Sequence, residues 1–154
     1  VERNLAYYRD VTELKDHIVG EIKGSHDKSS PFELARITWP VIRSHMAEIK
    51  KQMLQKLEDS IGNGHYASGI DQVWDTAFEG RGSILLVEEE FQFPAVINED
   101  NQILSPAEDS TSPGVVDDAV DEIIEEVINR GGQVFFVDKD DLKVHNRIAM
   151  VLRY

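Results

Sequence analysis

The sequence predicts an α/β fold, a three-layer α/β/α sandwich with a mixed central sheet. Two observations support this prediction. Three short apolar runs have the length of strands that are buried on both faces, and amphipathic segments of helical period precede and separate them. The chain has 154 residues, of which 41% are hydrophobic and 29% charged, enough for one domain with a sizeable core. The three runs are residues 83–87, 134–137 and 148–152.

The N-terminal part contains the start signal of a long helix. Residues 7–22 form a moderately amphipathic segment, which a polar loop follows. Ser30 is placed as the N-cap, Pro31 as the first helical residue and Glu33 as the residue whose carboxylate returns to the cap. Pro40 lacks a backbone donor and crowds the preceding turn, so we expect it to kink this helix or to begin its second half.

Apolar residues recur along the long helix at spacings of three and four, which predicts one buried stripe. A second, shorter helix is expected over residues 68–79, between two glycine-containing turns. The predicted stripe of the long helix consists of Ile42, Met46, Ile49, Met53 and Leu57.

The C-terminal half continues with a hairpin, a loop and a third helix. Residues 93–97 and 102–104 flank a polar turn and are expected to pair, and residues 105–114 read as a polar loop. The third helix begins near Val116 and ends at the glycine pair before the second apolar run. We divide the domain into an N-terminal helical part, residues 1–60, and an α/β core, residues 61–154.

Charge and composition exclude several classes of function. There are 29 acidic and 16 basic residues, a net charge of −13, which argues against a broadly basic surface for nucleic acid. The excess is confined to residues 61–154, because residues 1–60 hold ten residues of each sign. No apolar run approaches the roughly 20 residues that cross a bilayer. The absence of cysteine excludes disulfides and thiolate sites and fits a reducing compartment, so we expect a cytoplasmic protein.

Acidic clusters at predicted strand ends are the strongest candidates for chemistry. Residues 88–90 are all glutamate, and Asp138, Asp140 and Asp141 follow the second apolar run. Active sites of open α/β sheets often lie at such strand ends. Neither cluster has a histidine at ligand spacing or matches a calcium loop, so we favour a structural or solubilising role and expect no metal, no cofactor and no catalytic residue.

Residues 131–133, Gly-Gly-Gln, match the catalytic triplet of peptide-chain release factors, which lies at the tip of an exposed loop. Here the triplet stands between an amphipathic helix and an apolar run. Gly131 therefore reads as the left-handed residue that ends the helix, and Gln133 as the entry to a strand. We interpret the triplet as structural.

Several segments nevertheless resemble one domain of that family. Residues 148–154, Ile-Ala-Met-Val-Leu-Arg-Tyr, resemble the end of the third domain of archaeal and eukaryotic class-one release factors and of Pelota. Residues 78–87 are similar to the helix, glycine turn and first strong strand of that domain, and residues 117–134 to its following helix and strand.

The closer resemblance is to the bacterial archaeo-eukaryotic release-factor-like group. Its tyrosine-arginine segment is matched by residues 7–11, and its helix start and Trp-Pro pair by residues 30–34 and 38–42. Together these similarities span nearly the whole chain. In that group a strand and further domains precede the matched region, so the resemblance implies an isolated C-terminal domain.

The resemblance implies a fold shared with L7Ae-type RNA-binding proteins, used in release factors mainly to dock a translational GTPase and other partners. Catalysis in those factors belongs to the middle domain. We therefore expect a non-catalytic interaction domain linked to translation termination or ribosome rescue, which docks a protein partner or the ribosome and binds no membrane. Two alternatives remain open: an L7Ae-type RNA-binding module, and a metal-dependent hydrolase using the strand-end acids.

Two sets of residues follow as candidate contact sites. The outer face of the third helix is acidic and suits a basic protein partner. Direct binding of nucleic acid by this domain is not expected, and the residues that could face RNA are four cations of the long helix. The acidic face comprises Asp117, Asp118, Asp121, Glu122, Glu125 and Glu126, and the four cations are Arg43, Lys50, Lys51 and Lys56.

Overall fold

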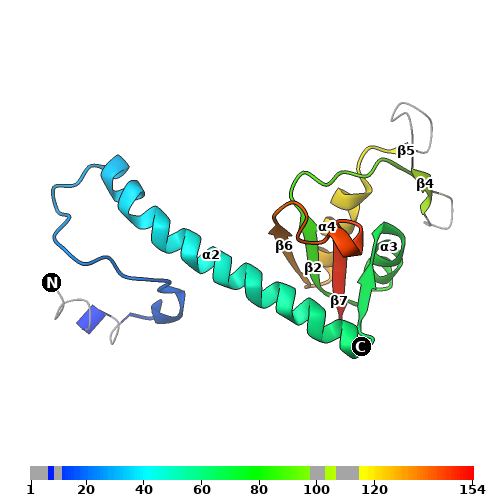
Figure 1. Cartoon of the computed structure of the whole chain (residues 1–154), viewed down its shortest axis with the longest axis horizontal. Helices are drawn as coiled ribbons and strands as arrows, with labels where there is room; N and C mark the ends of the chain where they lie inside the picture. Colours follow the sequence, from blue (N-terminus) through cyan, green and yellow to red (C-terminus); the bar gives the residue numbers. More distant parts are fainter. Residues whose placement is uncertain (1–6, 9–11, 98–102, 107–114) are drawn as a thin grey trace. The chain divides into compact units, whose positions relative to one another are not determined.

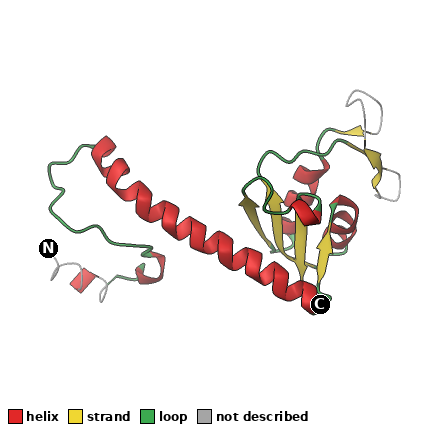
Figure 2. Ribbon diagram, in the orientation of Figure 1, coloured by secondary structure: helices red, strands yellow, loops and turns green. Residues whose placement is uncertain are grey.

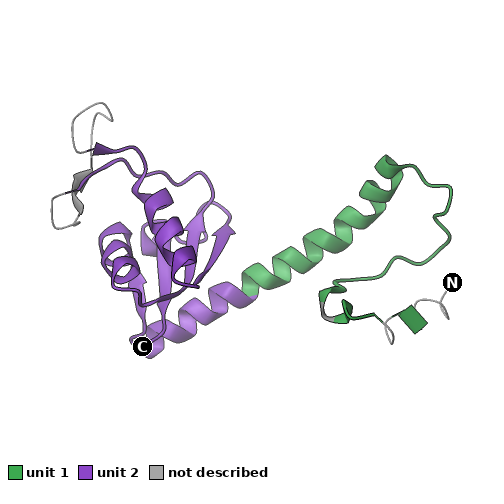
Figure 3. Cartoon of the chain, turned by 180° about the vertical axis from the view of Figure 1, so that it is seen from behind, with its two compact units in different colours: residues 1–51 green, residues 52–154 purple. Residues whose placement is uncertain are grey.

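The structure, a computed structural model, consists of two compact units (Figure 3). The first comprises residues 1–51 and the second residues 52–154, so the boundary falls inside the long helix. The division of one domain into two parts, residues 1–60 and 61–154, stays a prediction. The structure describes residues 7–8, 12–97, 103–106 and 115–154.

The long helix, α2, extends over Pro31–Gly62 and starts as predicted. The backbone N–H of Ser30 donates to Glu33 Oε2 at 2.8 Å, and the N–H of Glu33 donates to Ser30 Oγ at 3.3 Å, which is the reciprocal capping box. Pro40 lies inside the helix, which continues through it. That Pro40 kinks the helix, or begins its second half, stays a prediction. The missing N–H removes only one hydrogen bond from the ladder of a 32-residue helix.

Residues 7–22 form less helix than their amphipathic pattern suggested. Among the described residues of this range, helical structure is limited to residues 7–8 and the 3-10 turn η1, Lys15–His17. Leu14 and Val19 are exposed, at 58% and 48%. An amphipathic pattern stabilises a helix only where its apolar side is buried, and these two side chains are largely exposed.

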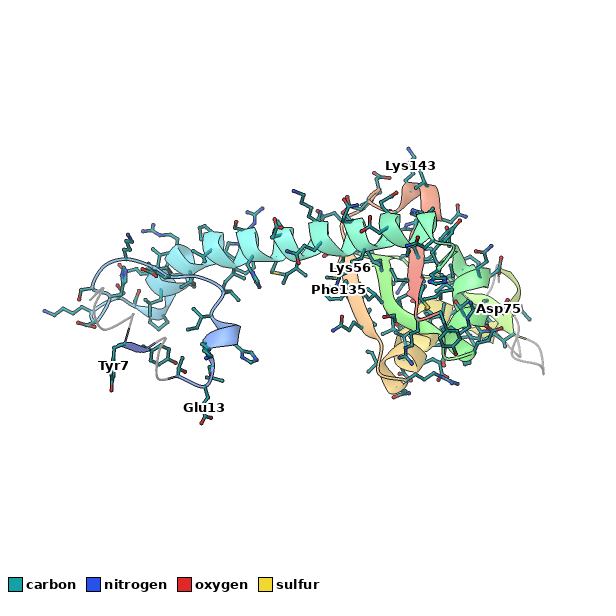
Figure 4. All side chains as sticks on the ribbon, turned by 90° about the horizontal axis from the view of Figure 1, so that it is seen from below. Tyr7, Glu13, Lys56, Asp75, Phe135 and Lys143 are labelled. Carbon is teal, nitrogen blue, oxygen red and sulfur yellow. The ribbon has the colours of Figure 1, made fainter. Side chains whose placement is uncertain are left out.

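The apolar stripe of α2 is buried only in its last turns. Met53 and Leu57 are 7% and 1% exposed, whereas Ile42 and Met46 are 37% and 59% exposed. The predicted continuous buried stripe is therefore wrong for the N-terminal turns of α2. Burial requires a second apolar surface, and in the second unit the sheet provides one for the turns around Met53 and Leu57 (Figure 4).

The main sheet of the second unit has the strand order β1-β7-β2-β6 (Figure 1). β2 pairs in parallel with β6 and antiparallel with β7, so the sheet is mixed, as predicted. β7 also pairs antiparallel with β1, a short strand that the sequence pattern did not predict. The strands are β1 (Tyr66–Ser68), β2 (Gly82–Glu88), β6 (Gln133–Val137) and β7 (Ile148–Leu152).

The three apolar runs differ in their positions within this sheet. β2 and β7 are central and almost wholly buried, as their sequences predicted. β6 lies at the edge of the described sheet, and its Phe136 is 58% exposed. The prediction that this run is buried on both faces is therefore wrong, because an apolar run shows that a strand packs but not how many strands flank it.

Helices cover both faces of the sheet, which gives the predicted three layers (Figures 2 and 4). α3 (Ile70–Phe78) and α4 (Ala119–Asn129) pack together on one face over Leu85, Val87 and Met150. Side chains alternate along a strand, so Ile84 and Leu86 face the opposite side, toward the last turns of α2. None of the described helices is long and apolar enough to cross a membrane.

A second, three-stranded sheet has the order β4-β3-β5. β3 and β4 pair antiparallel, which confirms the predicted hairpin, although its turn and most of the predicted loop after it lie outside the described residues. Val116 belongs to β5 and not to the third helix, which starts after Asp118. The strands are β3 (Ala95–Ile97), β4 (Ile103–Pro106) and β5 (Val115–Val116).

Candidate functional site

A cleft of about 660 Å³ lies where β2 and β6 end. These strands are parallel, so their carboxyl ends meet at one edge of the sheet, beside the 3-10 turn η2, Lys143–His145, that precedes β7. The fold thus brings together most of the strand-end acids, along with three cations. Asp141 is the exception, because its carboxylate accepts the Asp138 N–H at 3.1 Å and does not line the cleft. The lining residues are Glu88, Glu89, Glu90, Asp138, Lys139, Asp140, Lys143, Asn146 and Arg147.

Glu88, the last residue of β2, is 2% exposed and fully engaged. Its Oε1 accepts the backbone N–H of Leu142 and its Oε2 accepts Nε–H of Arg147, both at 3.0 Å. Burial alone would raise the pKa of Glu88, but the Arg147 guanidinium and the N–H groups of Leu142 and Asp140 outweigh burial and lower the pKa below its usual value. Glu88 is therefore a buried anion with a structural role.

Arg147 is held in place from three directions. Its guanidinium lies over the Phe91 ring, 4.7 Å from the centroid, and is paired with Glu88. Its carbonyl oxygen accepts the Glu88 N–H at 3.0 Å, and its φ of +71° is one that side chains rarely adopt. Asn146 before it also has a positive φ, +53°. The cleft is thus organised around an ion pair that joins β2 to the turn before β7.

This arrangement does not favour the metal-dependent hydrolase. Within the part of the chain that the structure describes, no group of three or more His, Asp or Glu residues is placed to hold a metal ion. Glu88 already binds Arg147 and Leu142, and the Asp141 carboxylate already accepts a backbone N–H. The strand-end acids are close together because the topology aligns strand ends, and the ligands of Glu88 and Asp141 are protein groups.

A Ser–His contact near this cleft was missed by the sequence analysis. Ser68 Oγ, at the end of β1, lies 3.2 Å from Nδ1 of His145, which is 7% exposed. The contact ties β1 to the η2 turn. The two residues are 77 positions apart, and no spacing rule could have paired them.

The acidic face of α4 divides into engaged and exposed carboxylates. Asp118 caps the helix, because its Oδ1 accepts the N–H groups of Val120 and Phe93, both at 3.0 Å. Glu126 pairs with Arg130 one turn later. The other four carboxylates are exposed and extend the face along the helix. They belong to Asp117, Asp121, Glu122 and Glu125.

The four cations of α2 do not form one basic side. Arg43 and Lys50 are seven residues apart, about two turns, and share a face. Lys51 and Lys56 project from other sides, since they are eight and thirteen residues from Arg43. Arg43, Lys51 and Lys56 are exposed, and Lys50 is half-buried.

The Gly-Gly-Gln triplet occupies the tight connection between α4 and β6. Gly131 has a φ of +75°, and its N–H donates to the Ile128 carbonyl at 2.9 Å, which ends the helix. Gln133 is the first residue of β6 and pairs with Ile84 of β2. The predicted placement of this triplet, a helix end followed by the start of a strand, is confirmed.

The comparisons with known proteins agree with this architecture. Residues 1–81, more than half of the chain, match the family "Bacterial archaeo-eukaryotic release factor family 3". The chain belongs to this family. Among functionally characterised proteins, no sequence match to this family 3 chain is found.

The fold of this family 3 chain is that of release-factor C-terminal domains. The C-terminal domain of peptide chain release factor from Methanosarcina mazei superimposes with a TM-score of 0.59 at 18% identity, over 82% of this chain and 97% of that domain. An archaeal Pelota, in a model bound to the ribosome with ABCE1, gives 0.57 at 18% identity, over 87% of this chain. Saccharomyces cerevisiae Dom34, described as interacting with Hbs1, gives 0.52 at 13% identity, over 82% of this chain. The chain spans about a third of these two proteins, 34% and 31%.

Proposed function

We propose that this family 3 chain is a non-catalytic interaction domain of a release-factor-like protein, which serves translation termination or ribosome rescue in the cytoplasm by docking a protein partner or the ribosome. The observation that carries the proposal is the fold, which matches nearly the full length of a release-factor C-terminal domain. The likeness to ribosome-bound Pelota and to Dom34, which interacts with Hbs1, supports a translational GTPase or the ribosome as the class of partner.

The engaged state of Glu88 in the strand-end cleft, and of His145 near it, supports a non-catalytic role. A general acid or base must be able to exchange its proton with a substrate. Glu88 accepts two hydrogen bonds and is buried, and the contact of His145 with Ser68 joins two elements of the fold. These groups hold the cleft together.

The exposed carboxylates of α4 are the proposed docking face. Asp121, Glu122 and Glu125 project from the helix, and the second unit that carries them is strongly acidic. Such a face attracts a basic partner surface and mainly increases the rate of association. Asp118 is excluded from the face, because its carboxylate is committed to two backbone N–H groups.

Co-sedimentation and pull-down with purified components test the proposal. The tagged chain is mixed with ribosomes, or with purified translational GTPases, at increasing salt. We expect a complex with one of them that weakens with salt. Neutralising the face, Asp121→Asn with Glu125→Gln, should weaken the complex about 5-fold or more by slowing association. The matched control is Asp71→Asn with Asp75→Asn, two exposed acids with the same spacing on α3.

The outcomes separate docking from its proposed location. Absence of binding to ribosomes and to every GTPase contradicts the docking function. If the α3 control weakens binding as much as the α4 variant does, the location of the docking face on α4 is contradicted, but the docking function is not. Binding to RNA alone, through residues of the second unit, favours the L7Ae-type alternative.

A further inference from the structure

The first three turns of α2 display aromatic rings and guanidinium groups in alternation. Phe32, Arg36, Trp39 and Arg43 follow one another at spacings of four, three and four, which places them on one face of the helix. All four side chains are exposed, and the two rings strongly so, Phe32 at 78% and Trp39 at 56%. Large aromatic side chains are usually buried, so two exposed rings on one helix face indicate a contact surface.

A shallow hollow of about 340 Å³ lies between the two rings. Phe32, Arg36 and Trp39 line it together with Ala35 and Pro40. The small side chains of Ala35 and Pro40 leave space beside the two rings, and Arg36 stands between them in sequence. Every residue of this hollow belongs to the first unit.

The face carries positive charge without negative charge. The two acids of α2 in the first unit are Glu33, whose carboxylate binds Ser30 at the cap, and Glu48, five residues beyond Arg43 and thus turned away from it. Among the described residues, none forms an ion pair with Arg36 or Arg43. On a chain with a net charge of −13, a face of rings and guanidinium groups alone is a local exception.

The alternation limits what can cover this face. A second copy of the chain would bring four guanidinium groups into one interface without an acid from this face to pair with them, which is unfavourable. An apolar helix would bury both guanidinium groups without partners, which is strongly unfavourable. A nucleic acid strand meets both requirements, because each of its units carries a flat base that stacks on an aromatic ring and a phosphate that binds a cation.

We infer that this face, Phe32, Arg36, Trp39 and Arg43, binds single-stranded RNA. Phe32 and Trp39 stack on bases, and Arg36 and Arg43 bind the adjoining phosphates. This function is separate from the docking of a protein partner proposed for α4. The net charge that argued against nucleic acid belongs to the second unit, since residues 1–51 hold nine basic and eight acidic residues.

The test measures binding of a fluorescein-labelled, mixed-sequence 12-nucleotide RNA to the chain by fluorescence anisotropy. We expect binding at about 50 mM salt that weakens as salt rises, with a log–log slope near −1.4 for two phosphate contacts. Unlabelled RNA should quench the tryptophan emission of the chain. The chain has two tryptophans, and RNA can reach Trp39, which is exposed, whereas Trp74 is only 2% exposed.

Variants assign the binding to the face. Trp39→Ala should weaken the affinity about 10-fold and abolish the quenching, and Trp39→Phe should restore most of the affinity because a ring remains. Arg43→Ala should reduce the salt slope by about 0.7. The matched controls are Phe136→Ala, an exposed ring on β6, and Lys51→Ala, an exposed cation on another side of α2. Neither control should change the affinity more than about 2-fold.

Four results would overturn the inference. The first is that the chain binds no RNA at about 50 mM salt, and the second is that Trp39→Ala leaves the RNA affinity unchanged. The third is that a Glu-rich helical peptide binds through Trp39 and RNA does not. The fourth is that the chain self-associates and Trp39→Ala abolishes the self-association. The peptide result would assign the face to an acidic protein segment, and self-association to a second copy. Circular dichroism of each variant confirms that α2 remains helical.

Discussion

Glu88 shows how the role of a single carboxylate depends on its neighbours. In the sequence it is the first of three consecutive glutamates at a strand end, and nothing distinguishes it from Glu89 and Glu90. In the fold it is 2% exposed and accepts two hydrogen bonds, whereas Glu89 and Glu90 are exposed. A buried anion is stable only when its partners replace water, and Arg147 and the Leu142 N–H do so here.

Removing this charge should destabilise the second unit. Glu88→Gln leaves the Arg147 guanidinium without its anion and should lower the free energy of unfolding by about 2–3 kcal/mol, less than for a fully buried pair because Arg147 is partly exposed. Urea unfolding at neutral pH measures the change. Glu89→Gln, the exposed neighbour, should stay within about 0.5 kcal/mol of the unmodified chain. Equal effects of the two substitutions would contradict the structural role of Glu88.

The same carboxylate should make stability depend on acidity. The pKa of Glu88 is lower in the folded chain than in the unfolded chain, so its stabilisation is complete above the ordinary value of about 4.3. It is lost as the pH falls through the lowered pKa, because the unfolded state binds the proton first. As the pH falls from about 5 through the lowered pKa, the unmodified chain should therefore lose more stability than Glu88→Gln does. Parallel losses in the two chains would show that Glu88 is not responsible.

At the scale of elements, the start of α4 depends on one side chain. Asp118 accepts the N–H of Val120 inside the helix and the N–H of Phe93 from the segment before β3, so it fixes α4 to the small sheet. Asp118→Ala should cost about 1–2 kcal/mol in thermal or urea unfolding. Asp117→Ala, one residue earlier and exposed, is the matched control and should be nearly neutral. A neutral Asp118→Ala would mean that other groups satisfy these N–H donors.

In the connection between α4 and β6, substitution of Gly132 should destabilise the fold, whereas substitution of Gln133 should have little effect on stability. A Cβ on Gly132 would lie 2.6 Å from Val127 Cγ1 and 3.0 Å from the Val127 carbonyl oxygen. Gly132→Ala should therefore cost about 2 kcal/mol in urea unfolding.

Gln133 provides the comparison within the same connection. It is exposed, so Gln133→Ala should change stability by less than about 0.5 kcal/mol. It should also leave unchanged any peptidyl-tRNA hydrolysis by a protein that contains this chain. A large loss of that hydrolysis would contradict the structural interpretation of the triplet.

At the scale of the whole molecule, the second unit depends on its C-terminal strand. β7 lies between β1 and β2, and Ile148, Ala149 and Met150 are fully buried. Deleting residues 148–154 removes a central strand and the partner of two others, so cooperative melting of the second unit should be lost. Circular dichroism and calorimetry measure this. A truncated chain that still melts cooperatively would contradict the central position of β7.

Local patterns in the sequence determined the elements with strong signals. The capping box of Ser30 and Glu33 predicted the start of α2, and the apolar runs predicted β2 and β7 as central strands. These signals depend on residues a few positions apart, so no knowledge of the fold is needed to interpret them. The weak strand β1 lacked such a pattern, because it has three residues and only Ala67 is buried.

The roles of the candidate site residues depended on the tertiary structure more than the positions of the strong helices and strands did. The sequence alone determined that the acids of α4 lie on one side of a helix, and that the chain is acidic mainly after residue 60. Only the fold decided that Asp118 and Glu88 are engaged, since their partners, Phe93 and Arg147, are 25 and 59 positions away. It also decided that α2 buries Leu57 and exposes Trp39. Periodicity specifies which side chains share a face, and burial requires a second surface that only the folded chain supplies.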